Sequence, residues 1–216
     1  MELDPKSLDP SDRYKLLIGS VVPRPIAFVS SRSPQGVVNL APFSYFNAVG
    51  HKPLALMFSV SKKPDGSEKD TLRNVRPVSE GGLGEYVINL AVDAYVQQVA
   101  EAAEPLPHSE SEFDYLELTK APSKLVAPPR VAESPVAFEC QTLQIVTVGE
   151  FTMVIGEVVH LFIRDDLVDD RYRVDTDKLA AVGRLAGYDY CHIQDRFTIP
   201  NGFSAQKKAA LEKPQQ

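Results

Sequence analysis

The stretch GVVNLAPFSYF, residues 36–46, has the β-branched and aromatic content of a buried strand, yet small polar residues and a proline interrupt its alternation. A proline cannot donate a backbone hydrogen bond to a sheet, so the chain around Pro42 is expected at an edge, a bulge or a rim. There the amides of Phe43 and Ser44 are free to meet a ligand, and small side chains let a flat ring approach. The alternative is that Pro42 ends one strand and that Ser44 and Asn47 cap turns.

The rest of the chain contains many further runs typical of antiparallel strands. A Pro/Gly turn at 33–36 and the pair Gly149-Glu150 each separate two such runs, as in hairpins. Helices are inserted between strands rather than alternating strictly with them. This favours a mainly β antiparallel barrel with peripheral helices over a doubly wound parallel sheet. Strands are predicted at 26–31, 37–41, 53–61, 85–91, 136–149 and 151–164, and helices are predicted to start near residues 10, 67, 94 and 112.

The composition fits a folded protein with one domain. The 216 residues, 44% hydrophobic and 24% charged, predict a single domain over 1–200 and a polar C-terminal tail over 201–216. The sequence has no membrane-spanning run, and its acidic N-terminus lacks the features of a secretory signal, so a cytoplasmic location is expected. A formal net charge of -6 argues against nucleic acid or a membrane surface as a partner. Any anion that binds here therefore needs a local site.

Motifs that would allow the polypeptide to catalyse a reaction unaided are absent from the sequence. Cys140 and Cys191 form no CxxC pair, and the four histidines have no metal-ligand spacing, so neither a metal site nor a disulfide framework is expected. The sequence also lacks GxSxG, HExxH, GxxxxGK[ST] and a GxGxxG that follows a strand. We therefore assign no catalytic side chain and expect the reactive group to arrive with a cofactor.

A second stretch predicts where such a cofactor binds. Ser67 and Asp70 have the spacing of a capping box, which predicts a helix start near Lys69. Lys69 and Thr71 would then stand beside exposed amides and the positive end of the helix dipole, a combination that binds phosphate. An ordinary capped helix with a solvated lysine is the alternative. Together, a platform for a ring and a site for a phosphate describe a holder for a mononucleotide.

Separated motifs, occurring in the same order, resemble the flavin reductase-like proteins that have the FMN-binding split barrel. The run at 21–60, with RPIAFVSS and NLAPFSYF, is similar to the opening of that family. KDTLRN at 69–74 is similar to its KDT-x-x-N helix start. The segments at 149–166 and 178–190 resemble its FIGEV strand and its RLGG-x-x-Y segment. The likeness covers about residues 11–198.

The resemblance implies an antiparallel Greek-key split barrel that forms a homodimer and holds FMN near the subunit interface. It also implies a set of cofactor-binding residues. Because a carboxylate repels a phosphate, Asp70 is expected to act only as a cap or a supporting partner. The residues expected to line the ring and the ribityl chain are Asn39, Ala41, Pro42, Phe43 and Ser44. Those expected at the phosphate end are Lys69, Asp70 and Thr71, and further candidates are Arg24 and Ser31.

Two positions depart from the pattern of the family. Many members carry an Asp-His pair before the FIGEV strand, with the histidine near the nicotinamide, whereas this chain has Glu150-Phe151. Ala186 replaces a glycine of the RLGG segment, which is a smaller change. The missing histidine moves the resemblance toward the flavoredoxin-like branch.

The function implied is that of an FMN-binding oxidoreductase, an NAD(P)H-dependent flavin reductase. NADH or NADPH would deliver hydride to flavin N5, and the electrons would pass to free flavin or a partner protein. The alternatives are a flavoredoxin-like electron carrier or FMN-binding protein without nicotinamide turnover, and an oxidase of the pyridoxamine phosphate type. The excursion at 104–130, with Phe113 and Tyr115, is either a lid or an ordinary surface loop. A lone histidine such as His192 is more often structural and receives no catalytic role.

Overall fold

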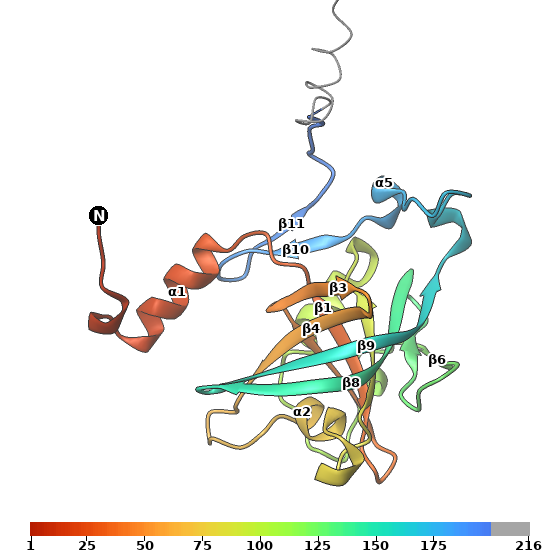
Figure 1. Cartoon of the computed structure of the whole chain (residues 1–216), viewed down its shortest axis with the longest axis horizontal. Helices are drawn as coiled ribbons and strands as arrows, with labels where there is room; N and C mark the ends of the chain where they lie inside the picture. The colour runs from red at the N-terminus through yellow and green to blue at the C-terminus, as the bar shows by residue number, and fades with distance from the viewer. Residues whose placement is uncertain (200–216) are drawn as a thin grey trace, which may run out of the picture.

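The computed structural model describes residues 1–199 and contains a seven-stranded antiparallel sheet (Figure 1). The strands lie in the order β2-β1-β5-β8-β9-β4-β3. Two smaller sheets pair β6 with β7 and β10 with β11. The predicted tail at 201–216 lies outside the described residues. The strands are β1 (Ala27–Arg32), β2 (Val38–Phe43), β3 (Phe46–His51), β4 (Leu54–Ser61), β5 (Glu85–Leu90), β6 (Lys120–Ala121), β7 (Arg130–Val131), β8 (Val136–Val148), β9 (Phe151–Ile163), β10 (Val182–Arg184) and β11 (Tyr190–His192).

The two edge strands of the main sheet, β2 and β3, are consecutive in the chain and are joined only by Ser44 and Tyr45. In a flat sheet these edges would lie about 29 Å apart, because neighbouring strands are spaced by about 4.8 Å. A connection of three peptide units reaches at most about 11 Å. The sheet must therefore curl until its edges approach each other. This confirms the predicted antiparallel split barrel, and it places the split at Ser44 and Tyr45.

The connection from β4 to β5 gives the barrel its Greek-key character. β4 is followed by α2 (Asp70–Val75) and then by β5, but β5 pairs with β1 and β8 instead of with β4. The chain therefore crosses one end of the barrel through α2. This crossing brings Lys69, the residue before α2, to the same part of the molecule as β1 and β2.

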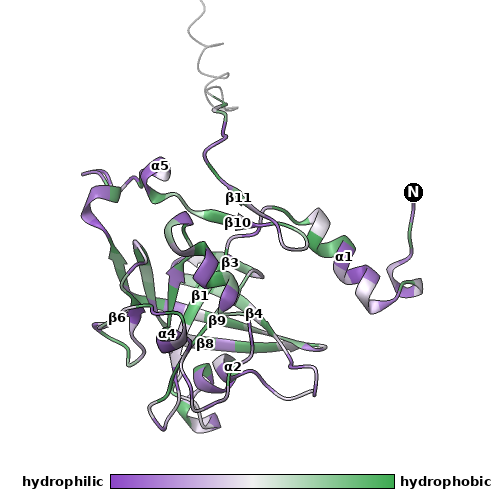
Figure 2. Ribbon diagram, turned by 180° about the vertical axis from the view of Figure 1, so that it is seen from behind, coloured by the Kyte–Doolittle hydropathy of each residue, from purple (hydrophilic) through white to green (hydrophobic). Residues whose placement is uncertain are grey.

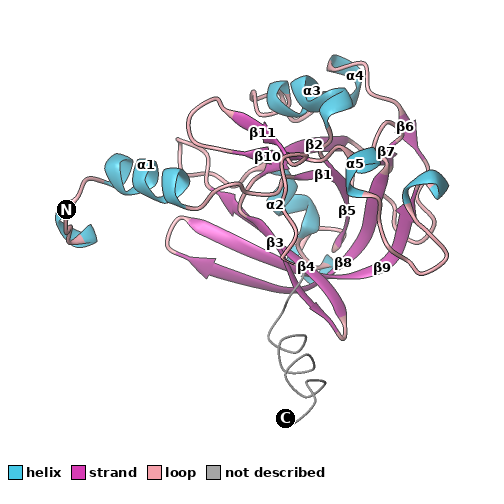
Figure 3. Cartoon of the chain, turned by 90° about the horizontal axis from the view of Figure 1, so that it is seen from above, coloured by secondary structure: helices cyan, strands magenta, loops and turns pink. Residues whose placement is uncertain are grey.

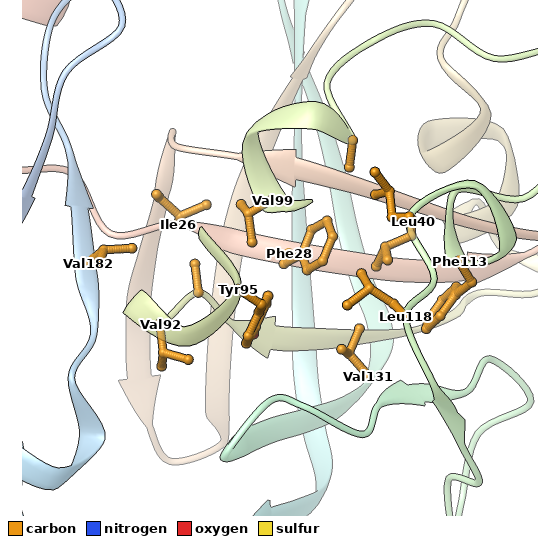
Figure 4. Close-up of a cluster of buried hydrophobic side chains, with 13 residues drawn as sticks. Ile26, Phe28, Leu40, Val92, Tyr95, Val99, Phe113, Leu118, Val131 and Val182 are labelled. Atoms are coloured by element: carbon orange, nitrogen blue, oxygen red, sulfur yellow. The ribbon is translucent and has the colours of Figure 1, made fainter. Parts of the chain in front are cut away.

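Strand β1 separates two hydrophobic clusters. Val29 faces the barrel interior, where Phe58 and Tyr86 are fully buried. Phe28 faces the opposite side and packs against Tyr95 in the outer cluster that Figure 4 shows. Because alternate residues of a strand point to opposite faces, both faces of β1 are covered, and five of its six residues are buried, the polar Ser30 and Ser31 among them.

Helix α1 (Pro10–Ser20) projects from the barrel as an arm (Figures 1 and 3). Ile18 is its buried residue, whereas Tyr14 and Leu17 are about half exposed, at 54% and 48%. Figure 2 shows hydrophobic and hydrophilic residues along this arm. The other α-helices are α3 (Val96–Glu101), α4 (Glu112–Tyr115) and α5 (Thr176–Leu179). Within the described residues, every helix is too short or too polar to span a bilayer.

The predicted capping box before α2 is wrong. The helix begins at Asp70 with Lys69 as its N-cap residue, and no side chain caps it. Ser67 lies two positions before this N-cap, and its hydroxyl donates to Asp65 at 2.6 Å. Because α2 has only six residues, its dipole contributes less positive potential at Lys69 than the sequence analysis assumed. A phosphate site here must depend on side-chain charge.

The excursion at 104–130 covers the sheet and does not form a lid over the split. Phe113 is fully buried in the outer cluster, while Tyr115 is 64% exposed. The buried Glu112 carboxylate accepts a hydrogen bond at 2.8 Å from the backbone N–H of Leu40, on the free edge of β2. This contact satisfies an edge amide that would otherwise be unpaired. The lid alternative is therefore wrong for Phe113, which is a core residue.

Because the carboxyl group of Glu112 is buried, the stability of the fold is expected to depend on pH. Burial raises its pKa above the ordinary value of 4.5, although the Leu40 amide partly opposes this. The folded protein therefore holds the proton more tightly than the unfolded chain, so this contribution is full below about pH 4.5 and is lost as the pH rises through the folded pKa. Glu112→Gln is expected to flatten that fall, as measured by urea unfolding between about pH 5 and pH 8. Identical slopes for the two proteins would contradict this account.

Candidate functional site

A pocket of about 250 Å³ lies at the split of the barrel, and we call it the split pocket. Segments far apart in sequence form its walls: arm α1, the link between β2 and β3, strand β4, the start of α2, and the β10–β11 connection. The lining residues include five of the predicted cofactor residues, namely Arg24, Pro42, Phe43, Ser44 and Lys69. The other lining residues are Tyr14, Ile18, Tyr45, Ser59, Ser61, Phe151, Arg184, Leu185 and Gly187.

The split pocket is positively charged. Arg24, Lys69 and Arg184 line it, and no acidic side chain is among its described lining residues. This is a local excess of positive charge in a chain whose formal net charge is -6. Cationic side chains that lack acidic partners favour an anion, and charge-assisted hydrogen bonds to phosphate or carboxylate are stronger than neutral ones. The sequence expectation that an anion needs a local site is met here.

Arg24 is held in place by backbone carbonyl groups. It is only 6% exposed, and its guanidinium donates to the carbonyl oxygens of Ile18, Val21 and Leu185 at 2.7, 2.8 and 2.9 Å. A weaker contact of 3.4 Å joins its Nε to the Ser44 hydroxyl. Neutral carbonyls fix the side chain without cancelling its charge. Arg24 therefore joins the end of α1, the split and the β10–β11 connection around one buried positive charge.

Lys69 differs from its neighbour Lys63 in its partners. Lys63 pairs with Asp70 at 3.3 Å, whereas Lys69 forms no ion pair with any residue of the described chain. Burial lowers the pKa of the Lys69 ammonium, and the nearby charge of Lys63 lowers it further. A half-buried ammonium without an acid is unfavourable in isolation, so an anionic ligand would relieve this cost.

Three predicted site residues form a polar network beneath the pocket and do not line it. The Asn39 amide donates to the Thr71 hydroxyl at 2.8 Å and to the Ser31 hydroxyl at 3.5 Å. Asn74 donates to the same Ser31 hydroxyl at 3.1 Å. Ser31 and Thr71 are almost fully buried. These bonds attach the first turn of α2 to strands β1 and β2 and so position Lys69.

Asp70 lies away from the split pocket. Its carboxylate bonds to Arg73, to Lys63 and to His108, whose Nδ1 is 2.6 Å away. Burial alone would raise the pKa of Asp70, but the hydrogen bonds from Arg73 and His108, with the charges of Arg73 and Lys63, lower it overall. Asp70 therefore attaches the loop that carries His108 to α2. The role of Asp70 as a supporting partner of a phosphate site stays a prediction.

Pro42 stands inside an edge strand, as predicted. Strand β2 continues to Phe43, pairs only with β1, and places Pro42 opposite Phe28. The alternative in which Pro42 ends the strand is therefore wrong. Asn47 likewise lies within β3 and does not cap a turn. The predicted residue Ala41 packs against the barrel interior and does not line the split pocket.

Several lining residues were missed by the sequence interpretation. The rings of Tyr45 and Phe151 lie 5.6 Å apart at 31°, and burial, with the nearby Tyr14, raises the pKa of Tyr45. Arg184 stands in the RLAG segment, so its motif was a usable signal, whereas nothing in the sequence linked Tyr14 to the split. His192 pairs with Asp93 at 2.8 Å and does not line the pocket.

A second cavity, of about 660 Å³, continues from the split pocket along α1 toward the tip of the β8–β9 hairpin. The two cavities share Tyr14, Tyr45, Ser59 and Phe151. The outer cavity is mostly apolar and has Arg13 and Glu150 as its charged lining residues, while the inner one is lined by three cations. A ligand with a flat apolar part and an anionic part would match this polarity.

Comparisons with known proteins agree over nearly the whole chain. The model of the flavin reductase like domain matches residues 18–179. Protein BH2278 of Halalkalibacterium halodurans is 39% identical over 214 residues, which cover 96% of this chain and 100% of that protein. Nitrilotriacetate monooxygenase component B from Bacillus cereus is 34% identical with a TM-score of 0.86, over 92% of this chain and 98% of that one. The 2-nitrobenzoate 2-nitroreductase NbaA of Pseudomonas fluorescens is 29% identical with a TM-score of 0.83, over 94% and 97%.

The split barrel, the order of its motifs and these likenesses lead to one conclusion: the chain belongs to the flavin reductase like domain family.

Proposed function

We propose that this protein is an FMN-binding oxidoreductase, an NAD(P)H-dependent flavin reductase. The observation that carries the proposal is the split pocket, where three cations meet at an opening of the barrel and no acidic residue is among the described residues that line it. Membership of the flavin reductase like domain family supports it. So does the likeness to component B of nitrilotriacetate monooxygenase.

The residues present fit FMN. Its phosphate is an anion that needs the charges of Lys69 and Arg184, which have no acidic partner among the described residues that line the pocket. Its flat ring needs apolar and aromatic walls, and Pro42 and Tyr45 supply these at the split. The split pocket and the outer cavity together lie within the size range of cofactor sites.

The side chains and backbone of the protein would bind FMN, orient it and polarise it. When bound, FMN would supply the redox chemistry by accepting hydride from NADH or NADPH and releasing electrons to an acceptor. The fixed positive charge of Arg24 would stabilise negative charge that develops beside it during reduction. Tyr45 and Phe151 would keep water from the reacting faces. No protein nucleophile takes part.

A homodimer is part of the proposal. Arm α1 leaves Tyr14 and Leu17 about half exposed next to the outer cavity, so a second copy could cover both. Light scattering should then report twice the mass of one chain. A monomer at micromolar concentration would remove the dimer from the proposal without affecting the pocket.

The alternative is a flavoredoxin-like electron carrier. One observation favours it: Phe151, which lines both cavities, occupies the place where many relatives have a histidine near the nicotinamide. Anaerobic mixing of the FMN-loaded protein with NADH or NADPH distinguishes the two. A reductase bleaches the flavin absorbance within seconds, and a carrier stays oxidised. Free flavin and 2-nitrobenzoate, the latter suggested by the likeness to NbaA, would then be compared as acceptors.

A further inference from the structure

Lys69 has the surroundings of a reactive amine. It is half-buried, lines the split pocket, and forms no ion pair within residues 1–199. The neighbouring Lys63, in contrast, forms an ion pair with Asp70. The other cations that line the pocket, Arg24 and Arg184, carry guanidinium groups, which have no free lone pair with which to attack an aldehyde. Lys69 is therefore the one amine among the described lining residues, and it stands in a site that attracts anions.

We propose that Lys69 forms a reversible imine with aldehydes that carry a phosphate group, and that such aldehydes compete with the nucleotide for the split pocket. The aldehyde carbon would meet the Lys69 amine while a guanidinium holds the phosphate. Imine formation needs only the cationic pocket and this amine, whereas the competition rests on the proposed binding of FMN.

Two physical effects make the amine available. A nucleophilic amine must be unprotonated, and desolvation together with a neighbouring cation favours the neutral form. Both effects are present, because burial and the charge of Lys63 lower the pKa of Lys69. Lysines on the open surface, such as Lys52, are not desolvated in this way. Reaction at Lys69 should therefore be selective within the chain.

The chemical step is balanced by water and one proton. The ammonium first gives a proton to solvent, and the neutral Nζ of Lys69 then attacks the aldehyde carbon, forming a C–N bond. The carbinolamine that results loses its oxygen as water, and the C=N bond forms. No oxidant or reductant is consumed, and hydrolysis returns the free amine and the aldehyde.

Pyridoxal 5′-phosphate is the probe, and borohydride traps the imine as a stable secondary amine. We expect one modified lysine per chain, located at Lys69 by peptide mapping of the unmutated protein. Pyridoxal, which lacks the phosphate, should react at least about tenfold more weakly, since the charge-assisted bonds are lost. Inorganic phosphate and FMN should each protect the site.

Lysine-to-arginine variants provide the matched controls. Lys69→Arg keeps the positive charge but cannot form an imine, so labelling should disappear. Lys63→Arg keeps the charge beside Lys69 and should label as the unmutated protein does. Labelling spread over several lysines, or equal labelling by pyridoxal and its phosphate, would overturn the proposal. Because peptide mapping uses the unmutated chain, this result does not depend on the variants folding. Failure here with normal FMN binding would leave the proposed function standing.

Discussion

Replacing Lys69 with alanine is expected to weaken FMN binding about 10- to 100-fold. A hydrogen bond to a charged group contributes about 1.5–3 kcal/mol, and each 1.4 kcal/mol changes a dissociation constant tenfold. Lys69 lines the split pocket and has no acidic partner in the described chain, so its charge is available to the ligand. Titration of apoprotein into FMN, followed by the quenching of flavin fluorescence, measures the change.

Lys63→Ala is the matched control for this measurement. Lys63 lies six positions earlier, carries the same charge, pairs with Asp70 and does not line the split pocket. Its loss should change FMN affinity by less than about threefold, which is the size of a screened electrostatic effect. Equal losses for the two variants would mean that general positive charge, and not the Lys69 contact, holds the phosphate.

The second large effect is expected from Gly156→Ala in the middle of β9. A Cβ atom at this position would lie 1.9 Å from the Tyr86 hydroxyl oxygen and 3.1 Å from the backbone oxygen of Gln141. Tyr86 is fully buried in the barrel interior and cannot move outward without displacing Phe58, whose ring lies 5.4 Å away. Overpacking of this kind costs about 1–3 kcal/mol. Urea unfolding should show that loss in the free energy of unfolding.

Tyr86→Phe tests whether the hydroxyl is the cause. Apart from the Cys140 thiol beside it, the hydroxyl has no hydrogen-bond partner among the described residues, so its removal alone should change stability by less than about 1 kcal/mol. Combined with Gly156→Ala, it should recover part of the loss. Recovery remains partial because the ring carbon Cζ still lies 2.8 Å from the new Cβ. Strict additivity of the two changes would show that the clash lies elsewhere.

The strands were predictable because their patterns are local. β4 is apolar at six of its eight residues, and the Gly149-Glu150 turn separates two long runs that pair in the structure. Pro42 indicated an edge, since a proline cannot donate to a sheet. The split itself follows because β2 and β3 are consecutive in the chain and yet form the two opposite edges of the sheet. The order of strands in the sheet cannot be predicted from local sequence patterns.

The site was only partly predictable, because motifs do not show where side chains point. Lys69 and Asp70 are adjacent, yet one lines the split pocket and the other bonds to Lys63, Arg73 and His108. Tyr14 reaches the pocket from an arm whose direction is set by carbonyl contacts with Arg24. Such long-range contacts leave no local periodicity in the sequence.

The proposed function requires that the cationic pocket at the split hold one FMN per chain. The most direct test is equilibrium dialysis of the purified protein against FMN, followed by the absorbance spectrum and by identification of the flavin released on denaturation. We predict a yellow protein with one FMN per chain. Protein that stays colourless at saturating FMN would contradict the claim.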